Sequence, residues 1–326
     1  MKVLSYLGLG VGIGLLIALL VWQGFGTVLG LLLDTGWSLL LLPLVWLPML
    51  LPATLSWRML FLPGRTPSFL QTLHALWMGR AVNTLLPVAS VGGEVVKARL
   101  LVLWGVSGAD ATASVVVDKT VQVFAVLLLG LISALLLLRL AVDDALAAAL
   151  LAGIVVLAAA TAGFIVAQRA GLFGFATRTT ARLTNSDFWK GLVEGAGEVD
   201  AVIGQLYRRS ARIVVSTGLR LIAFTYPAVE VWLAAYLLGF PIGLLEAILL
   251  RGLSNTLSDI AFFVPNAYGV QEGAYIALGA LVGMPAETAL ALSLATRIRE
   301  LVVDAPGVIA WQHAEGQAFI RRRQVS

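Results

Sequence analysis

The stretch Pro87-Val-Ala-Ser-Val-Gly-Gly-Glu94 decides the fold, because the chain repeats its plan at Pro265-Asn-Ala-Tyr-Gly-Val-Gln-Glu272. In each stretch a proline is followed seven residues later by a glutamate, with glycine between them at Gly92, Gly93 and Gly269. Proline removes a backbone donor and glycine lowers helix preference, so each stretch predicts a broken helix. Paired breaks in two halves of a membrane protein point to a transport site near the bilayer midplane.

The composition predicts an integral membrane protein. Of the 326 residues, 60% are hydrophobic and 12% are charged, and the mean hydropathy is +0.94, far from the balance of a soluble domain. The net charge of +4 comes from basic residues gathered between apolar runs, where membrane orientation explains them better than nucleic acid does. The sequence has no cysteine and two histidines, which excludes disulfides and leaves too few ligands for a histidine-based metal site.

A transmembrane helix needs about 20 apolar residues, and six ranges of the sequence meet this measure. They are 3–22, 37–60, 113–138, 145–167, 213–238 and 286–311. Gly24, Gly26 and Asp34 predict the turn between the first two. Basic residues across 168–212 and at the end of the chain predict that this polar segment and both termini are cytoplasmic. The segment itself fits an amphipathic helix or a solvated connector.

Two further apolar ranges, 67–100 and 242–284, contain the breaks and are too interrupted for one straight span each. We expect them to form re-entrant helical hairpins that enter from opposite faces of the membrane. The predicted fold is therefore all-α, with about six full transmembrane helices and two hairpins that form an inverted repeat. No linker separates domains, so residues 1–326 are predicted to form a single transmembrane domain.

The two glutamates, Glu94 and Glu272, are the leading candidates for function. An ionisable side chain beside a helix break at membrane depth is costly, and it is a functional hypothesis by default. We expect both carboxylates to line one cavity, where they gate or couple transport. The alternative is structural, since each glutamate could cap a half-helix, whose N-terminus favours negative charge by about 0.3 to 1 kcal/mol.

Other polar residues in the apolar segments complete the predicted substrate or coupling site. They are Arg80, Asn83, Lys97, Arg251, Asn255, Asp259, Asn266, Gln271, Arg297, Glu300 and Asp304. The last three share one helix face, with Arg299 turned away, and this face should look into the bundle. A purely structural network of ion pairs would explain the same face.

Two pairs of charged residues that are close in the sequence can be explained without a role in transport. Lys97 with Arg99 fits an anchor at the membrane interface, and Asp118 with Lys119 fits a self-contained ion pair near the cytoplasmic edge. The sequence has no nucleotide-binding loop, serine-hydrolase elbow or zinc-protease motif. We therefore predict no catalytic residue, no metal site and no cofactor, and transport that runs downhill or on an ion gradient.

Four stretches carry a resemblance to a known family, namely 85–99, 113–118, 263–273 and 289–311. They resemble the lysylphosphatidylglycerol synthase transmembrane, or flippase-like, family, and within it the membrane proteins associated with hopanoid biosynthesis. In the larger synthases an aminoacyl-transferase domain follows the membrane part, and the 326 residues leave no room for it. The resemblance thus implies a lipid-translocating protein of the bacterial inner membrane that does not synthesise lipid.

The predicted function is that of a lipid flippase or transporter and not of an enzyme. Its expected partner is a membrane lipid, either a hopanoid or another lipid with a polar headgroup, and nucleic acid is not expected. A homo-oligomer or a complex of lipid biosynthesis remains open. The alternatives are a membrane enzyme, such as a lipid-modifying transferase, and a scaffold that transports nothing.

Overall fold

The computed structural model describes residues 13–86, 92–139, 187–260 and 264–325, together with isolated positions between 148 and 163. Within these residues the protein is helical and has no strand, which confirms the predicted all-α class. The helices are α2 (Phe25–Thr35), α3 (Leu41–Trp46), α4 (Leu50–Arg58), α5 (Phe69–Leu85), α6 (Gly92–Leu103), α7 (Gly108–Arg139), α10 (Asp187–Tyr207), α11 (Ser210–Thr225), α12 (Ala228–Leu237), α13 (Leu244–Ile260), α14 (Val270–Leu281) and α15 (Ala286–Val325). The 3₁₀ turns η1 (Gly36–Leu40), η2 (Leu47–Met49) and η3 (Pro265–Ala267) lie between them.

Three described segments are long and apolar enough to cross a membrane: Phe25–Arg58, Gly108–Leu137 and Ser210–Leu237. They overlap three of the predicted spans and support a membrane protein. The range 145–167 falls almost wholly outside the described residues, as does the start of the first span, so the count of six spans stays a prediction. The predicted turn occurs at Gly24, whose φ angle is 81°, but Gly26 and Asp34 lie inside α2, which the strongly helix-forming leucines carry on to Thr35.

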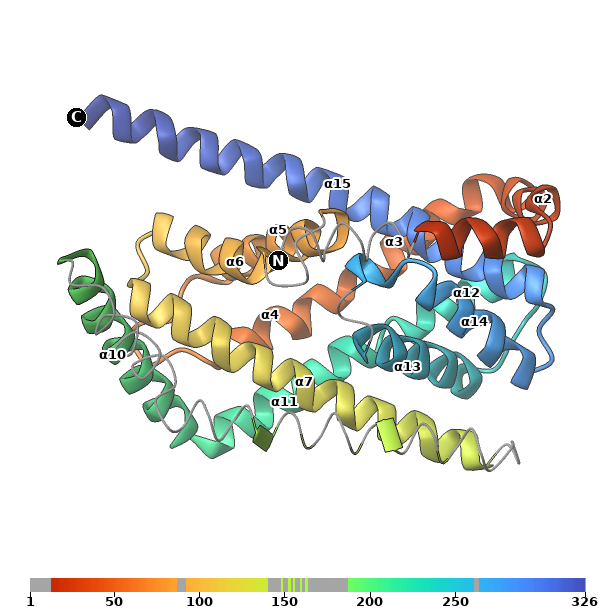
Figure 1. Cartoon of the computed structure of the whole chain (residues 1–326), viewed down its shortest axis with the longest axis horizontal. Coiled ribbons are helices and arrows are strands. Elements are labelled where there is room, and N and C mark those ends of the chain that lie inside the picture. Colours follow the sequence, from red (N-terminus) through yellow and green to blue (C-terminus); the bar gives the residue numbers. More distant parts are fainter. Residues whose placement is uncertain are drawn as a thin grey trace.

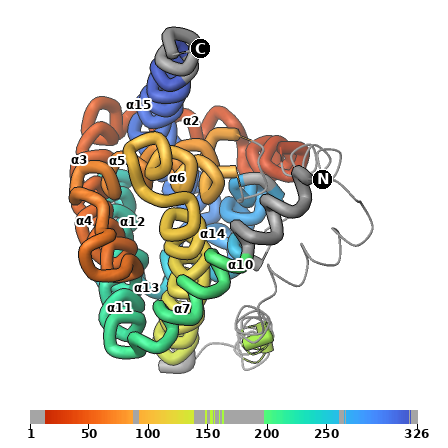
Figure 2. The backbone as a smooth tube through the Cα atoms, turned by 90° about the vertical axis from the view of Figure 1, so that its left-hand side faces the viewer, coloured from red at the N-terminus to blue at the C-terminus, as the bar shows by residue number. Residues whose placement is uncertain are grey.

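The helices run mostly along the long axis of the molecule (Figure 1). The pair α5 and α6 lies in the left half of this view, and the pair α13 and α14 lies in the right half. The long helix α15 passes both pairs, packing on α14 with its first part and on α5 farther along. Seen from the left end, α15 lies at the top of the bundle and α7 and α11 at the bottom (Figure 2).

Two apolar clusters hold the bundle together. One joins α4, α5, α6, α10 and α11 to the first part of α7, around the buried Trp57, Phe61 and Leu100. The other joins α12, α13, α14 and the start of α15, around Leu250 and Tyr275. The two clusters share no residue, and buried charged side chains line or border the space between the two helix pairs.

The helix α10 covers part of the predicted amphipathic segment. Its side chains Val199, Val202, Ile203 and Leu206 are buried against the first apolar cluster, and the helix packs on α7. The apolar stripe recurs every three or four residues, which is the spacing of one helix face. Residues 168–186, the remainder of that predicted segment apart from its last few residues, lie outside the described residues.

Candidate functional site: a charged cavity between two helix pairs

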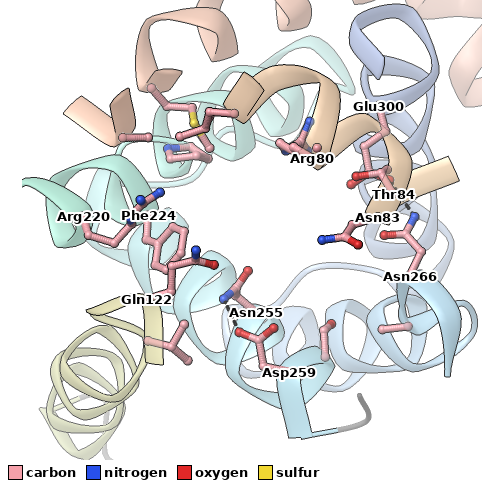
Figure 3. A pocket seen from close by; sticks show the side chains of 18 of the residues that line it. Arg80, Asn83, Thr84, Gln122, Arg220, Phe224, Asn255, Asp259, Asn266 and Glu300 are labelled. Carbon is pink, nitrogen blue, oxygen red and sulfur yellow. Dashed lines mark hydrogen bonds between the residues drawn. The ribbon is translucent and has the colours of Figure 1, made fainter. Parts of the chain in front are cut away.

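A cavity of about 510 Å³ lies between the two helix pairs (Figure 3). Its polar lining comes from α5, α6, α7, α11, α13, α14, α15 and the turn η3. These residues are Arg80, Asn83, Thr84, Glu94, Lys97, Lys119, Gln122, Arg220, Arg251, Asn255, Ser258, Asp259, Asn266, Gln271 and Glu300. Both sequence motifs therefore contribute to one cavity, and its lining holds more cationic side chains than carboxylates.

The first helix pair is held by a close crossing of two glycines. A Cβ atom on Gly93 would lie 2.0 Å from the carbonyl oxygen of Gly79, so no larger side chain fits there. Asn83 accepts a hydrogen bond of 2.7 Å from the backbone N–H of Gly93 and so caps the start of α6. Gly92 and Gly93 thus lie in the first turn of α6, and Pro87 lies outside the described residues.

Glu94 opens a network of ion pairs that crosses three helices. Its Oε2 atom lies 2.5 Å from Lys97 Nζ, which lies 2.9 Å from Asp118 Oδ2 on α7. Arg220 on α11 pairs with the other oxygen of Asp118, and Lys119 Nζ lies 4.0 Å from Glu94 Oε1. Glu94 and the three cations of the network line the cavity, and the buried Asp118 lies behind them.

This network corrects two expectations. The predicted self-contained pair of Asp118 and Lys119 is wrong, because adjacent residues on a helix point in different directions and find different partners. Lys97 is not an interface anchor, since it is only 5% exposed and lies 4.9 Å from the ring centre of Trp57. Arg99 is the exposed member of that pair, and it binds Glu315 on α15.

The second motif turns sharply before α14 begins. Asn266 and Ala267 both adopt positive φ angles of 50° and 48°, and Gly269 follows with 77°. Left-handed backbone costs a non-glycine residue about 1 to 2 kcal/mol, so the surroundings must hold this turn in place. The side chain of Arg297 contributes by donating to the carbonyl of Ala267 at 3.5 Å.

Glu272 differs from Glu94 in its surroundings. It is fully buried, its Oε2 atom accepts a 2.7 Å hydrogen bond from Gly269 N–H, and its Oε1 atom accepts one of 2.9 Å from Arg297 Nε. It is not among the lining residues, whereas the neighbouring Gln271 is. The two motifs are alike in sequence, but Asn83 caps the first half-helix and Glu272 itself caps the second.

Glu300 of α15 lines the cavity and binds the second motif. Its Oε2 atom accepts hydrogen bonds of 3.1 Å from both Arg297 Nη1 and Asn266 Nδ2. Figure 3 shows Glu300 and Asn266 on the side of the cavity that also carries Asn83 and Arg80. The face of α15 predicted to look into the bundle does so: Arg297 and Glu300 contact the second motif, and Asp304 pairs with Arg80 of α5.

A half-buried arginine of the cavity wall and a fully buried one stack on the same tryptophan. Arg80 binds Asp304 at 2.6 Å, and Arg299 binds Glu230 at 2.7 Å. Their guanidinium carbons lie 4.1 and 4.8 Å from the ring centre of Trp46. Arg299 was expected to turn away from the charged face, and it does so by pairing with Glu230 of α12 inside the bundle, where it is only 1% exposed.

Sequence reasoning did not assign several charged or polar residues to this site. They are Asp118, Lys119, Gln122, Arg220, Glu230 and Arg299. The cost of an ionisable residue within an apolar span could have identified Glu230 and Arg220, which lie inside the predicted span 213–238. Their partners could not be identified in this way, because they come from distant helices. Among the described residues no group of three or more potential metal ligands occurs.

The comparison with known families agrees with this architecture. The chain matches the family described as lysylphosphatidylglycerol synthase TM region over residues 7–307. It belongs to this family. No curated protein and no solved structure matches the chain. Membership of the lysylphosphatidylglycerol synthase TM family connects the protein with a membrane lipid-related function, as the sequence motifs implied.

Proposed function

We propose that the protein moves a lipid with a polar headgroup across the bacterial inner membrane and carries out no chemical reaction on it. The observation that carries this proposal is the 510 Å³ cavity with charged walls, set between two broken helix pairs inside an apolar bundle. A charged cavity at this depth is costly in a membrane protein and is typical of a substrate path. Membership of a lipid-related family supports lipid as the substrate.

In this mechanism the headgroup passes through the cavity while the acyl chains remain in the bilayer. Transport requires sites that bind well enough to admit the headgroup and weakly enough to release it. The ion pairs of the wall meet this need, because Glu94 and Lys97 can each exchange a protein partner for a headgroup partner. Glu94 is the carboxylate that we assign to this exchange, since its side chain is 15% exposed and lines the cavity.

We further propose that the end of the bundle carrying α10 and the C-terminal part of α15 is cytoplasmic. Basic residues gather there, including Arg58 at the end of α4, Arg65 in the following loop and Arg208 after α10. Introduced cysteines test this in a chain that has none. We expect Thr66→Cys to react only after the membrane is opened and Pro241→Cys to react in intact cells. The opposite pattern would invert the topology.

The two alternatives make different predictions. A lipid-modifying transferase needs a free base or nucleophile, whereas Glu94 and Glu300 are both engaged in ion pairs. A scaffold would tolerate the loss of the Glu94 charge, because the remaining network would still pair Lys97 with Asp118. The Glu94→Gln variant therefore separates transport from a scaffold role.

The experiment is lipid movement in reconstituted vesicles, measured with fluorescent analogues of a phospholipid and of a hopanoid in separate preparations. We expect wild-type protein to move one class faster than protein-free vesicles do, and Glu94→Gln to slow it by about tenfold or more, equivalent to about 1.4 kcal/mol in the barrier. Glu315→Gln, at the exposed pair with Arg99, is the matched control and should transport normally. Equal rates in wild-type, Glu94→Gln and protein-free vesicles would contradict the proposal.

A further inference from the structure

One cation of the cavity wall differs from the others. Arg80, Lys97, Lys119 and Arg220 each lie within ion-pair distance of a carboxylate: Asp304 for Arg80, Glu94 and Asp118 for Lys97, Glu94 for Lys119, and Asp118 for Arg220. Arg251 of α13 also lines the cavity, but it forms no ion pair with any carboxylate of the described residues. Its Nε atom is buried and has no hydrogen-bond partner there. Glu230 and Asp259 attract Arg251 without forming an ion pair with it, and its other neighbour is the neutral hydroxyl of Tyr275.

A guanidinium without a carboxylate partner is expensive at this place. Transferring a charge from water into a helix bundle costs several kcal/mol unless a partner compensates it, and neutral residues of similar size would be more stable. A residue that lowers stability in this way is typical of a ligand site. The planar guanidinium fork matches the oxygens of phosphate and carboxylate groups, and it is always charged.

We propose that Arg251 binds the phosphate group of an anionic lipid headgroup in the cavity. This inference rests on the proposed lipid transport and names the substrate class. Lys119, on α7, supplies a second cation, since its side chain is 43% exposed and its carboxylate partner lies 4.0 Å away. Arg251, Lys119 and Asp259 all line the cavity, and both cations lie close enough to Asp259 to attract its carboxylate.

Asp259 restricts where the anion can bind. Its carboxylate accepts a 3.0 Å hydrogen bond from Asn255, one turn earlier on α13, and both side chains line the cavity (Figure 3). An anion that moved along α13 towards Asp259 would meet like charge. The phosphate therefore binds at the Arg251 end, and a neutral headgroup gains nothing from this arrangement.

The first test is thermal unfolding of the purified chain in a neutral detergent. We expect added phosphatidylglycerol to raise the midpoint, and diacylglycerol with the same acyl chains to leave it unchanged. In Arg251→Gln the apparent affinity for phosphatidylglycerol should fall by about tenfold or more, because one charge-assisted hydrogen bond to the phosphate is lost. Arg251→Lys keeps the positive charge and should bind more tightly than Arg251→Gln. Arg99→Gln is the control, because Arg99 is an exposed, paired cation outside the cavity.

Inorganic phosphate distinguishes a lipid from a free anion. We expect it to raise the unfolding midpoint much less than phosphatidylglycerol at equal concentration. An equal rise with inorganic phosphate, lost in Arg251→Gln, would assign the site to a soluble anion and overturn the lipid part of the proposal. An unchanged response to phosphatidylglycerol in Arg251→Gln would overturn the role of Arg251 altogether.

Two further measurements complete the test. The stability of Arg251→Gln without lipid shows whether Arg251 has a binding or a structural role, and the transport rates show whether this inference and the transport proposal fail separately. Without lipid, Arg251→Gln should be at least as stable as wild type, whereas a structural arginine would lose stability on removal. If wild type moves neutral and anionic analogues equally fast, transport stands and this inference fails. If lipid binding depends on Arg251 but wild type moves no lipid, the inference stands and the transport proposal fails.

Discussion

Replacing Glu272 with glutamine tests whether the glutamates of the two motifs have different roles, Glu272 in stability and Glu94 in transport. The change removes the negative charge that caps α14 and pairs with Arg297 at 2.9 Å, both in a fully buried place. Losing the charge at a helix N-terminus costs about 0.3 to 1 kcal/mol, and removing one partner of a buried ion pair costs about 3 to 5 kcal/mol. We expect the lower end, about 3 kcal/mol in total, because Glu300 still binds Arg297 at 3.1 Å.

The chain provides a matched control for this prediction. Glu246 caps α13 in the same way, accepting a 2.7 Å hydrogen bond from Gly243 N–H, but it forms no ion pair with an arginine of the described residues and lies at the surface. Glu246→Gln should therefore lose only the capping contribution. At about 2 °C or more for each kcal/mol, the unfolding midpoint of Glu272→Gln should lie at least about 4 °C below that of Glu246→Gln.

The assay is thermal unfolding of both variants in detergent, followed by lipid movement in vesicles at a temperature where both are folded. We expect folded Glu272→Gln to keep transport, whereas Glu94→Gln loses it. Equal midpoints for Glu272→Gln and Glu246→Gln would refute the buried ion pair as a source of stability. Loss of transport in fully folded Glu272→Gln would refute the division of roles between the two glutamates.

Three further predictions concern the residues that hold the walls of the cavity in place. Gly93→Ala should lower the free energy of unfolding by about 3 kcal/mol or more, because the new Cβ would lie 2.0 Å from a backbone oxygen of α5. In the control Gly273→Ala, where no heavy atom lies within 4 Å, it should rise by up to about 1 kcal/mol, and equal effects would contradict the close crossing. Arg299→Gln should lose about 3 kcal/mol by leaving Glu230 buried and unpaired, and adding Glu230→Gln should recover part of it; a double-mutant cycle without coupling would show that the pair contributes nothing. Asn83→Ala should cost about 1 kcal/mol as a lost helix cap, measured by the same unfolding assay, and no change there would mean that Gly93 N–H finds another acceptor.

The sequence was sufficient to predict the helix breaks and the charged face of α15. Proline and glycine act locally on the helix, and three charged residues at helical spacing share a face whatever surrounds them. The position of Asn266 and Gln271 beside the cavity follows from the same local signals. These features could be predicted because each depends on neighbours within a few residues.

The partners of the charged residues could not be predicted in this way. The sequence pairs Asp118 with Lys119, but the fold pairs it with Lys97 and Arg220, which are 21 and 102 residues away. The two motifs also look equivalent, and the difference arises because an asparagine of the preceding helix caps α6. Contacts between distant helices decide both points, and a single sequence contains no direct record of them.

Blocking the cavity tests the central claim most directly, that lipid headgroups pass between the two helix pairs. The measurement is the rate of lipid movement in vesicles that contain Asn255→Trp, which puts a large ring into the cavity from α13. The control is Leu70→Trp, at a position 62% exposed near the start of α5. We predict transport by wild type and Leu70→Trp and none by folded Asn255→Trp. Transport at the wild-type rate in Asn255→Trp would contradict the claim.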